Sequence, residues 1–327
     1  MRSSEGCWSD HSRNALSSVE PCSEHQLRWQ PMGNNAGHLT MTAIATVLSP
    51  TLDVDQFREL RDIIYEKSGI FYTENKVYLL ENRLGRRIKD LGMNSFKEYI
   101  SHIRSQDGRS EEFHQIYNAV TINETFFFRY QAQLDAFKNK LLVPLIKDRQ
   151  ASGKKRISVW SAASSSGEEL YTIAIMVHEV LGTQIKEWDI RLLGTDISHR
   201  ALKLANEAVY TKNSFRGAMR DQQKQQYFDE DGLIFKLKTE IKDMAQFRYL
   251  NLNDNAELRK LRGLDFIFCR NVLIYFDEEM KKRVLRSMYG VLNHGGYFFL
   301  GEAESLHGIS SSFTVEHFSG AFAYKKE

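Results

Sequence analysis

A run of small residues between an apolar stretch and a helix constrains this chain more than any other feature. Residues 159–169 read V-W-S-A-A-S-S-S-G-E-E, and nothing from Ser161 to Gly167 is larger than serine. Such a loop lets the backbone lie against a ligand, with N–H groups directed at it from a helix N-terminus. The run therefore predicts a strand, a cofactor-binding loop and a helix in succession. A plain strand-to-helix turn, with acidic residues that complement the helix dipole, is the alternative.

The acidic pair after the loop indicates which cofactor it binds. A dinucleotide site has the arrangement G-x-G-x-x-G, whose middle glycine admits the pyrophosphate, whereas here only Gly167 is glycine. Glu168 and Glu169 fall in the first helical turn, where a pyrophosphate would otherwise lie. A carboxylate in that place suits a ligand with a cationic end. S-adenosylmethionine, with an ammonium, a sulfonium and no phosphate, is such a ligand.

The C-terminal half of the chain, from residue 157, alternates apolar strands with helices. Strands are predicted at residues 157–160, 190–196, 264–269 and 297–300, and helices at 168–181, 200–208 and 277–292. This alternation predicts an α/β fold with a doubly wound, mostly parallel, Rossmann-like sheet. Gly295-Gly296 is expected to turn the chain before the strand at 297, and segments 313–318 and 321–325 are expected to form a closing hairpin.

Changes in composition divide the chain into parts. Residues 1–50 mix Ser, Asn, Gly and Pro without a lasting hydrophobic period, which predicts a disordered tail, and Met41 is an alternative start. Residues 51–125 carry four amphipathic helical patterns and predict a small all-helical domain. Residues 126–327 are expected to form the cofactor-binding domain. Within it, runs at 233–237 and 247–250 suggest a small antiparallel subdomain over about 228–250.

Charge and cysteine content argue against several classes of protein. The 327 residues have a formal net charge of +2, which gives no global signature of nucleic-acid or membrane binding. No apolar run is long enough to cross a bilayer and no signal peptide is expected, so a cytoplasmic location is the default. The three cysteines form no CxxC pair and the ten histidines make no spaced cluster with them, so neither a disulfide framework nor a metal site is predicted.

Polar residues follow the predicted strands at the edge where ligands bind to doubly wound sheets. Asp196 is placed to accept hydrogen bonds from a ribose diol, and capping of the helix near Ser198 is the alternative. Asn251 is placed to pair with an adenine edge while Leu252 packs on its face, although a plain turn would look the same.

Two further segments carry polar and aromatic groups together. Arg270-Asn271 follows a buried strand, where a charge and an amide need a partner or the mouth of a site, and Tyr275 can hold its ring beside a sulfonium. Residues 121–129 read T-I-N-E-T-F-F-F-R. Three consecutive phenylalanines cannot all face one core from a helix, so some are expected to serve a cavity, an interface or a turn.

These motifs, in their order, resemble those of the CheR-type chemotaxis receptor methyltransferases. They are T-x-N-x-T-x-F-x-R, V-W-S-A-A-x-S-x-G-E-E-x-Y, N-L-N and F-C-R-N-V-x-I-Y-F-D, and the resemblance runs from about Asp53 to the C-terminus. It implies methyl transfer from S-adenosylmethionine to glutamate side chains on chemoreceptor helices, with glutamate methyl esters and S-adenosylhomocysteine as products. Residues 126–327 would then be the methyltransferase domain.

The resemblance also implies roles for individual residues. Cofactor contacts are expected at Asn123, Thr125, Arg129, Glu168, Glu169, Asp196, Asn251, Leu252, Arg270 and Asn271. Glu169 is favoured over Glu168 for the methionine end, although the register leaves both open. Arg129 and Tyr275 are expected to be the catalytic walls of the methyl-transfer passage, with Arg129 orienting the acceptor carboxylate.

Docking of the acceptor is expected on a separate surface. The basic helix with Arg83, Arg86 and Arg87 resembles the family's receptor-docking helix, and a solvated charged face is the alternative. Residues 228–233 lack the glycine-bearing insertion of members that bind a receptor tether peptide, which favours a tether-independent enzyme. The partner is expected to be a chemoreceptor helical domain, with no nucleic acid, no insertion into the membrane and a monomeric enzyme.

Three other functions stay open on the sequence. A methyltransferase of a small molecule or RNA would use the same cofactor. A non-catalytic sensor would bind S-adenosylmethionine or its product and signal through the helical domain. An NAD-dependent dehydrogenase is disfavoured by the missing glycines.

Overall fold

The computed structural model describes residues 50–327. The tail before Pro50, Met41 as a start, and the cysteines at positions 7 and 22 therefore lie outside the described residues. Cys269, the remaining cysteine, is a free thiol with no exposed surface. No helix in the described range is long and apolar enough to cross a membrane.

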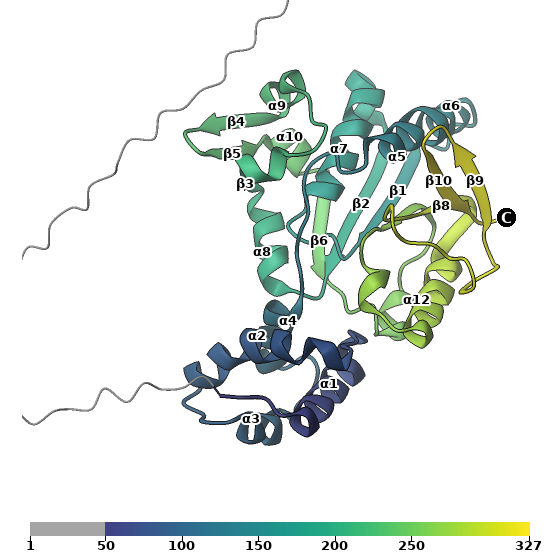
Figure 1. The fold of residues 1–327 in the computed structure, drawn as a ribbon. Coiled ribbons are helices and arrows are strands. Elements are labelled where there is room, and N and C mark those ends of the chain that lie inside the picture. The colour runs from purple at the N-terminus through teal and green to yellow at the C-terminus, as the bar shows by residue number, and fades with distance from the viewer. Residues whose placement is uncertain (1–49) are drawn as a thin grey trace, which may run out of the picture. The chain divides into compact units, whose positions relative to one another are not determined.

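Four helices form the first part of the described chain, as predicted (Figure 1). They are α1 (Val54–Ser68), α2 (Val77–Asp90), α3 (Phe96–Ile103) and α4 (Glu111–Val120), with the short 3-10 helix η1 (Glu74–Lys76) before α2. Side chains cap three of them, because Asp53, Ser95 and Ser110 each accept a hydrogen bond from a backbone N–H in the first turn. Gly69 ends α1 in the left-handed conformation, with φ of 76°.

A seven-stranded, mostly parallel sheet follows, which confirms the predicted fold class. Its strand order is β6-β2-β1-β7-β8-β10-β9, and β10 and β9 pair antiparallel at one edge as the predicted hairpin. The strands are β1 (Arg156–Ala162), β2 (Asp189–Asp196), β6 (Ala245–Tyr249), β7 (Leu264–Cys269), β8 (Leu292–Leu300), β9 (Thr314–Phe318) and β10 (Ala321–Lys325). The helices of this part are α5 (Gln131–Ala136), α6 (Val143–Ala151), α7 (Glu168–Leu181), α8 (His199–Glu207), α9 (Asp221–Tyr227), α10 (Thr239–Lys242), α11 (Asn255–Leu258) and α12 (Glu278–Val291). Short 3-10 helices are η3 (Gly182–Glu187), η4 (Lys212–Phe215) and η5 (Leu273–Tyr275).

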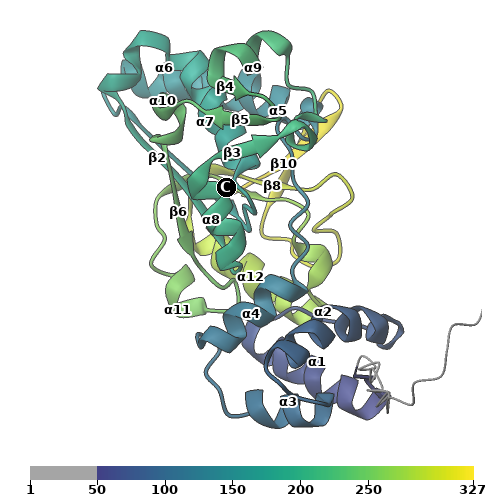
Figure 2. The same cartoon turned by 90° about the vertical axis from the view of Figure 1, so that its left-hand side faces the viewer.

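The small antiparallel sheet differs from the prediction in its membership. It consists of β3 (Val209–Thr211), β5 (Ile234–Leu237) and β4 (Phe228–Asp231), while the run at 247–250 enters the main sheet as part of β6. The reason is packing across β2. Gly194 leaves room for the Phe247 ring, which would lie 2.4 Å from a Cβ at that position. Figures 1 and 2 both place the small sheet at the far end of the main sheet from α1–α4.

The segment Phe137–Leu142 winds as a π-helix between α5 and α6, next to Pro144, which cannot donate the usual intrahelical hydrogen bond. One local prediction needs correction. Gly295-Gly296 does not turn the chain before a new strand. Both glycines lie inside β8, where the register with β7 shifts, and Gly295 has φ of 71°.

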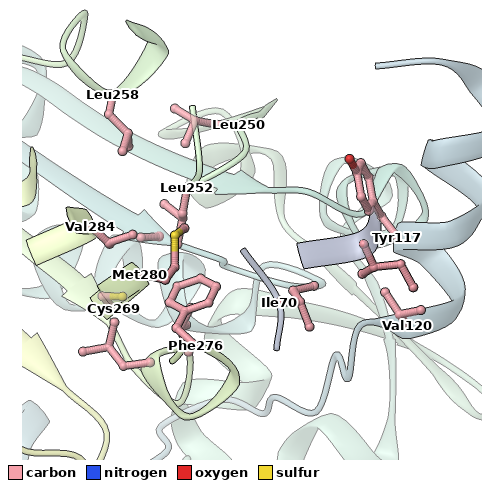
Figure 3. Close-up of a cluster of buried hydrophobic side chains, with 14 of the residues drawn as sticks. Ile70, Tyr117, Val120, Leu250, Leu252, Leu258, Cys269, Phe276, Met280 and Val284 are labelled. Carbon is pink, nitrogen blue, oxygen red and sulfur yellow. The ribbon is translucent and has the colours of Figure 1, made fainter. Parts of the chain in front are cut away.

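The sheet has an apolar core on each face. Along β1, Ile157 and Val159 join the core beneath α5–α7, whereas Trp160 and Ala162 join the core shared with α12 and the four-helix domain. Figure 3 shows this second core, with Leu252 close to Met280 and Ile70 on the side of the helical domain. The site described below borders this shared core, because Ile70, Val120 and Leu252 belong to both.

Candidate functional site

One cavity collects most of the residues that the sequence singled out. It has a volume of about 240 Å³ and lies where the carboxyl ends of β1, β2 and β7 meet the segment 120–129. Its lining includes Asn123, Thr125, Arg129, Glu169, Asp196, Asn251, Leu252, Arg270, Asn271 and Tyr275. Glu168 and the three arginines of α2 do not line it. The helical domain contributes Ser68, Ile70 and Val120, so both domains build this cavity.

The small-residue loop after β1 is bonded to the neighbouring strand. The Ser165 N–H donates to the Asp196 carboxylate at 2.9 Å, and the Ser164 N–H donates to the carbonyl of Thr195, also at 2.9 Å. The sequence suggested that such N–H groups are directed at a ligand, but these two are hydrogen-bonded within the fold. The loop instead fixes the carboxylate at the end of β2, while the Ser165 hydroxyl donates to the carbonyl of Asn123 at 3.0 Å and brings the 121–129 segment over the loop.

Asp196 is buried and anchored by two backbone groups. Besides Ser165, the N–H of Ser198 donates to its carboxylate at 2.9 Å. Burial raises the pKa of Asp196, and the hydrogen bonds from Ser198 and Ser165 oppose that shift. Ser198, and not Asp196, is the residue that caps α8, through its hydroxyl and the N–H of Ala201. The carboxylate keeps lone pairs on the cavity side, consistent with the predicted ribose contact.

The two adjacent glutamates have different surroundings. Glu169 lines the cavity, accepts a hydrogen bond from the Ser161 hydroxyl at 2.7 Å and pairs with Arg270 at 3.3 Å. Glu168 is 3% exposed and faces away from the cavity, where it accepts from the hydroxyls of Ser166 at 2.7 Å and Ser214 at 3.0 Å. Burial raises the pKa of both carboxyls, and Arg270 opposes the shift at Glu169. The geometry thus favours Glu169 for the cationic end of a cofactor.

Arg270 and Arg129 form a polar wall of the cavity. The Arg270 guanidinium pairs with Glu169, donates to the carbonyl of Arg129 and lies 4.9 Å from the ring centroid of Tyr130. The Arg129 guanidinium donates to the carbonyl of Glu124 at 3.0 Å and lies 5.3 Å from the ring centroid of Phe126. The two cations are therefore held by aromatic rings and carbonyls around the cavity.

Backbone strain concentrates at this wall and loop. Six non-glycine residues in the described chain have left-handed φ values, and all but Ala208 lie at the cavity or flank Arg129: Phe128, Tyr130, Ala163, Ser165 and Asn271. A non-glycine residue in this region costs about 1 kcal/mol or more, and such residues cluster at functional sites.

Three polar atoms at the cavity are buried without a hydrogen-bond partner among the described residues. They are the Nε atoms of Arg129 and Arg270 and the Oδ1 atom of Asn271. The Nε groups are donors suited to a carboxylate, and the amide oxygen is an acceptor suited to an ammonium. Unsatisfied buried groups are costly unless a ligand completes them, so this set fits the two ends of an amino acid.

Asn251 and Leu252 both line the cavity, and the structure supports the expected role of Leu252 better than that of Asn251. The Asn251 amide donates to the carbonyl of Lys67 at 2.6 Å, and its oxygen accepts from the N–H of Asn253 at 2.9 Å. This side chain therefore holds the end of α1 against the sheet, and its contact with an adenine edge stays a prediction. Leu252 is 7% exposed and lines the cavity as an apolar surface.

The three consecutive phenylalanines have three different surroundings. Phe127 is fully buried in the aromatic cluster of the small sheet, 4.8 Å from Tyr210 and 5.3 Å from Phe215 between ring centroids. Phe128 is buried above α7, where its N–H donates to the Thr172 hydroxyl at 3.1 Å. Phe126 lines the cavity. The expectation that they serve different environments is confirmed.

The arginines of α2 also differ from one another. Arg87 makes a bidentate ion pair with Glu112, which is 6% exposed, and Arg83 donates to the carbonyl of Val120 at 2.6 Å. Arg86 is exposed and makes no ion pair with any residue from 50 to 327. Of the three arginines, Arg86 is therefore the best candidate for docking an acceptor.

Sequence analysis missed the buried carboxylate of Glu304. It accepts hydrogen bonds from the N–H groups of Asn271, Val272, Ile274 and Gly301 at 2.7 to 3.3 Å, and so shapes the loop that carries Asn271 and Tyr275. The sequence pattern could have identified Glu304, because this residue follows the buried strand β8 at the same edge of the sheet as Asp196 and Arg270.

Comparison with known proteins agrees with this geometry. The profile described as CheR methyltransferase, SAM binding domain, matches residues 123–321, and that described as CheR methyltransferase, all-alpha domain, matches residues 55–121. The chain belongs to the CheR methyltransferase family. Chemotaxis protein methyltransferase 2 of Vibrio cholerae is 35% identical over 83% of this chain and 92% of that protein. Chemotaxis protein methyltransferase 1 of Pseudomonas aeruginosa is 34% identical over 82% of this chain and 96% of that protein.

Membership in the CheR family makes the chain a methyltransferase with S-adenosylmethionine as its cofactor, as predicted. The cavity residues fit that cofactor. Glu169 and the Asn271 oxygen would hold its ammonium, the free Nε groups of Arg129 and Arg270 its carboxylate, and Asp196 its ribose.

Proposed function

We propose that this methyltransferase esterifies glutamate side chains of chemoreceptors in the cytoplasm. The observation that carries the proposal is that Arg129 and Tyr275 line the same cavity as Glu169 and Asp196. A cation and an aromatic ring beside the cofactor residues suit an anionic acceptor approaching a sulfonium. The relatives named as chemotaxis protein methyltransferases support a chemoreceptor as the acceptor.

The chemistry asks for little besides positioning. A glutamate side chain has an unperturbed pKa of about 4.3, so it is ionised at neutral pH and needs no general base. S-adenosylmethionine supplies a methyl group activated by its sulfonium. Holding the reacting atoms in line can contribute roughly 7 to 11 kcal/mol in favourable cases. Arg129 would orient the acceptor carboxylate without neutralising it, because its guanidinium already donates to the Glu124 carbonyl and lies over the Phe126 ring.

The surface around the opening suits a helical acceptor. Ile122 and Ile274 line the cavity and are 48% and 56% exposed, which gives the opening an apolar rim. The exposed Arg86 adds a cation on α2 that attracts an acidic surface. The β4–β5 hairpin turns through Gly232-Leu233 without an insertion, which supports docking without a tether peptide.

The two adjacent glutamates provide a matched test of the cofactor site. We expect Glu169→Gln to raise the dissociation constant for S-adenosylmethionine about tenfold, because a neutral amide loses the charge-assisted hydrogen bond to the ammonium. Glu168→Gln makes the same change one residue away, outside the cavity, and is expected to leave the constant within twofold of wild type. Calorimetric titration of both proteins measures it, and equal losses in the two would contradict the assignment.

The arginines of α2 provide a second matched pair. Arg86→Glu is expected to raise the KM for chemoreceptors about tenfold at low salt with little change in kcat, because the charge reversal acts on encounter with an acidic partner. Arg87→Ala is expected to lower the free energy of unfolding by about 2 kcal/mol, because it leaves the Glu112 carboxylate without its cation. Kinetics at two salt concentrations and urea unfolding separate the two effects. An unchanged KM for the Arg86 variant would show that Arg86 takes no part in docking.

Transfer of radiolabel tests the acceptor. Methyl-labelled S-adenosylmethionine is incubated with the protein and chemoreceptor-containing membranes, and mild alkali releases label from esters as methanol. Alkali-labile label on the receptor band that disappears with the Asp196→Ala protein is the expected result. Tight cofactor binding without label would favour another acceptor.

A further inference from the structure

The segment that carries Arg129 needs support from elsewhere in the fold. Arg129 lies between Phe128 and Tyr130, whose φ values are 55° and 63°. A backbone in this conformation keeps its shape only where its surroundings over-determine it. Cavity and α7 contacts hold one side of the segment, through the Thr172 hydroxyl and Arg270.

A loop of the small antiparallel subdomain holds the other side. The Phe127 N–H donates to the carbonyl of Ser214 at 2.8 Å, which follows β3 in the short helix η4. Gly217 lies against the same segment so closely that a Cβ there would be 2.1 Å from the carbonyl oxygen of Phe127. The loop therefore meets the Arg129 segment backbone to backbone.

Arg216 connects this loop to two of the three groups that contact the Arg129 guanidinium, Glu124 and Phe126, the third being Tyr130. Its own guanidinium pairs with the Glu124 carboxylate at 2.8 Å and lies 4.7 Å from the ring centroid of Phe126. The Glu124 carbonyl accepts a hydrogen bond from Arg129, and the Phe126 ring lies beneath Arg129. Arg216 does not line the cavity itself.

We propose that Arg216 is a positioning residue for methyl transfer, which sets the Arg129 guanidinium through Glu124 and Phe126. The small subdomain thereby contributes to catalysis without touching the cofactor. The proposal rests on the role of Arg129 given above. The Glu124–Arg216 pair is half exposed, so its contribution to global stability is small and its effect is on the geometry of the segment.

Steady-state kinetics on chemoreceptor membranes tests the proposal. Arg216→Ala is expected to lower kcat about tenfold, because small misplacements of a catalytic group are costly, while the Kd for S-adenosylmethionine and the receptor KM stay within twofold. Arg220→Ala is the matched control, since Arg220 lies in the same subdomain and pairs with Glu179, away from the segment. It is expected to keep the wild-type kcat.

A double-mutant cycle distinguishes positioning from general damage. If Arg216 acts through Arg129, adding Arg216→Ala to the Arg129→Ala protein lowers kcat no further. The same tenfold loss in that background, or an effect confined to KM, would overturn the proposal. Should Arg216→Ala fail to fold, Glu124→Gln removes the ion pair but keeps the carbonyl that Arg129 uses, and a loss of about threefold is expected.

A second measurement needs no acceptor, so it stands even if chemoreceptors prove not to be the substrate. Amide hydrogen exchange of residues 124–130 is expected to become at least about fivefold faster in Arg216→Ala and to stay unchanged in Arg220→Ala. Failure of the proposed function would appear as absent label with the wild-type protein. Failure of the positioning role would appear as unchanged exchange in the Arg216 variant.

Discussion

Replacement of Asp196 by asparagine is expected to raise the dissociation constant for S-adenosylmethionine about a hundredfold, or about 2.7 kcal/mol. The carboxylate is fixed by the N–H groups of Ser165 and Ser198, both at 2.9 Å, and its remaining lone pairs face the cavity. An amide of the same shape keeps one oxygen, so it cannot accept from both backbone groups and from a ribose diol. Hydrogen bonds to a charged group contribute about 1.5 to 3 kcal/mol each, which accounts for the size of the loss. Calorimetric titration measures it.

Asp189→Asn is the matched control for this prediction. Asp189 begins the same strand, is exposed, and pairs with Arg156 and Arg191 far from the cavity. Its variant is expected to bind the cofactor as wild type does. Because burial raises the pKa of Asp196, wild-type affinity should fall on acidification at a higher pH than an exposed aspartate would give, and the Asp196→Asn protein should lack this fall. Equal affinity in both variants would exclude the ribose role.

The sequence predicts elements well where local signals and burial agree. Helix α7 covers the expected residues 168–181, because glycines stand on both sides of an apolar stretch, and β7 covers the expected 264–269, because both faces of a central strand are buried. The residue types at the strand ends likewise predicted which loops line the cavity. These features depend on neighbours in sequence.

Features that depend on distant packing could not be predicted. The choice between Glu168 and Glu169 is made by Ser214 and Arg270, which lie 46 and 101 positions away in the chain. The placement of β6 depends on the space that Gly194 leaves for Phe247. Likewise, the sequence could not show that Arg87 forms an ion pair with the buried Glu112. Sequence patterns identify the residues of such contacts but not their partners.

Removal of the Arg129 side chain is expected to lower kcat for receptor methylation about a hundredfold to a thousandfold. The reason is the loss of a cavity cation that shares the lining with Tyr275, whereas Arg270, the other arginine of the lining, is already paired with Glu169. Cofactor binding should weaken less than about tenfold, because Glu169, Arg270 and Asp196 remain. Single-turnover transfer with saturating cofactor measures the chemical step, and calorimetry measures the binding.

Two variants sharpen the test of Arg129. Arg129→Lys keeps a positive charge but not the planar fork that donates to the Glu124 carbonyl and lies over Phe126, so its kcat should fall between those of wild type and alanine. Arg191→Ala, at the opposite end of β2 from the cavity, removes an exposed arginine of the same size and should retain full activity. If Arg129→Ala turned over as fast as Arg191→Ala, positioning of the acceptor would have to be assigned to Tyr275 and the apolar rim instead.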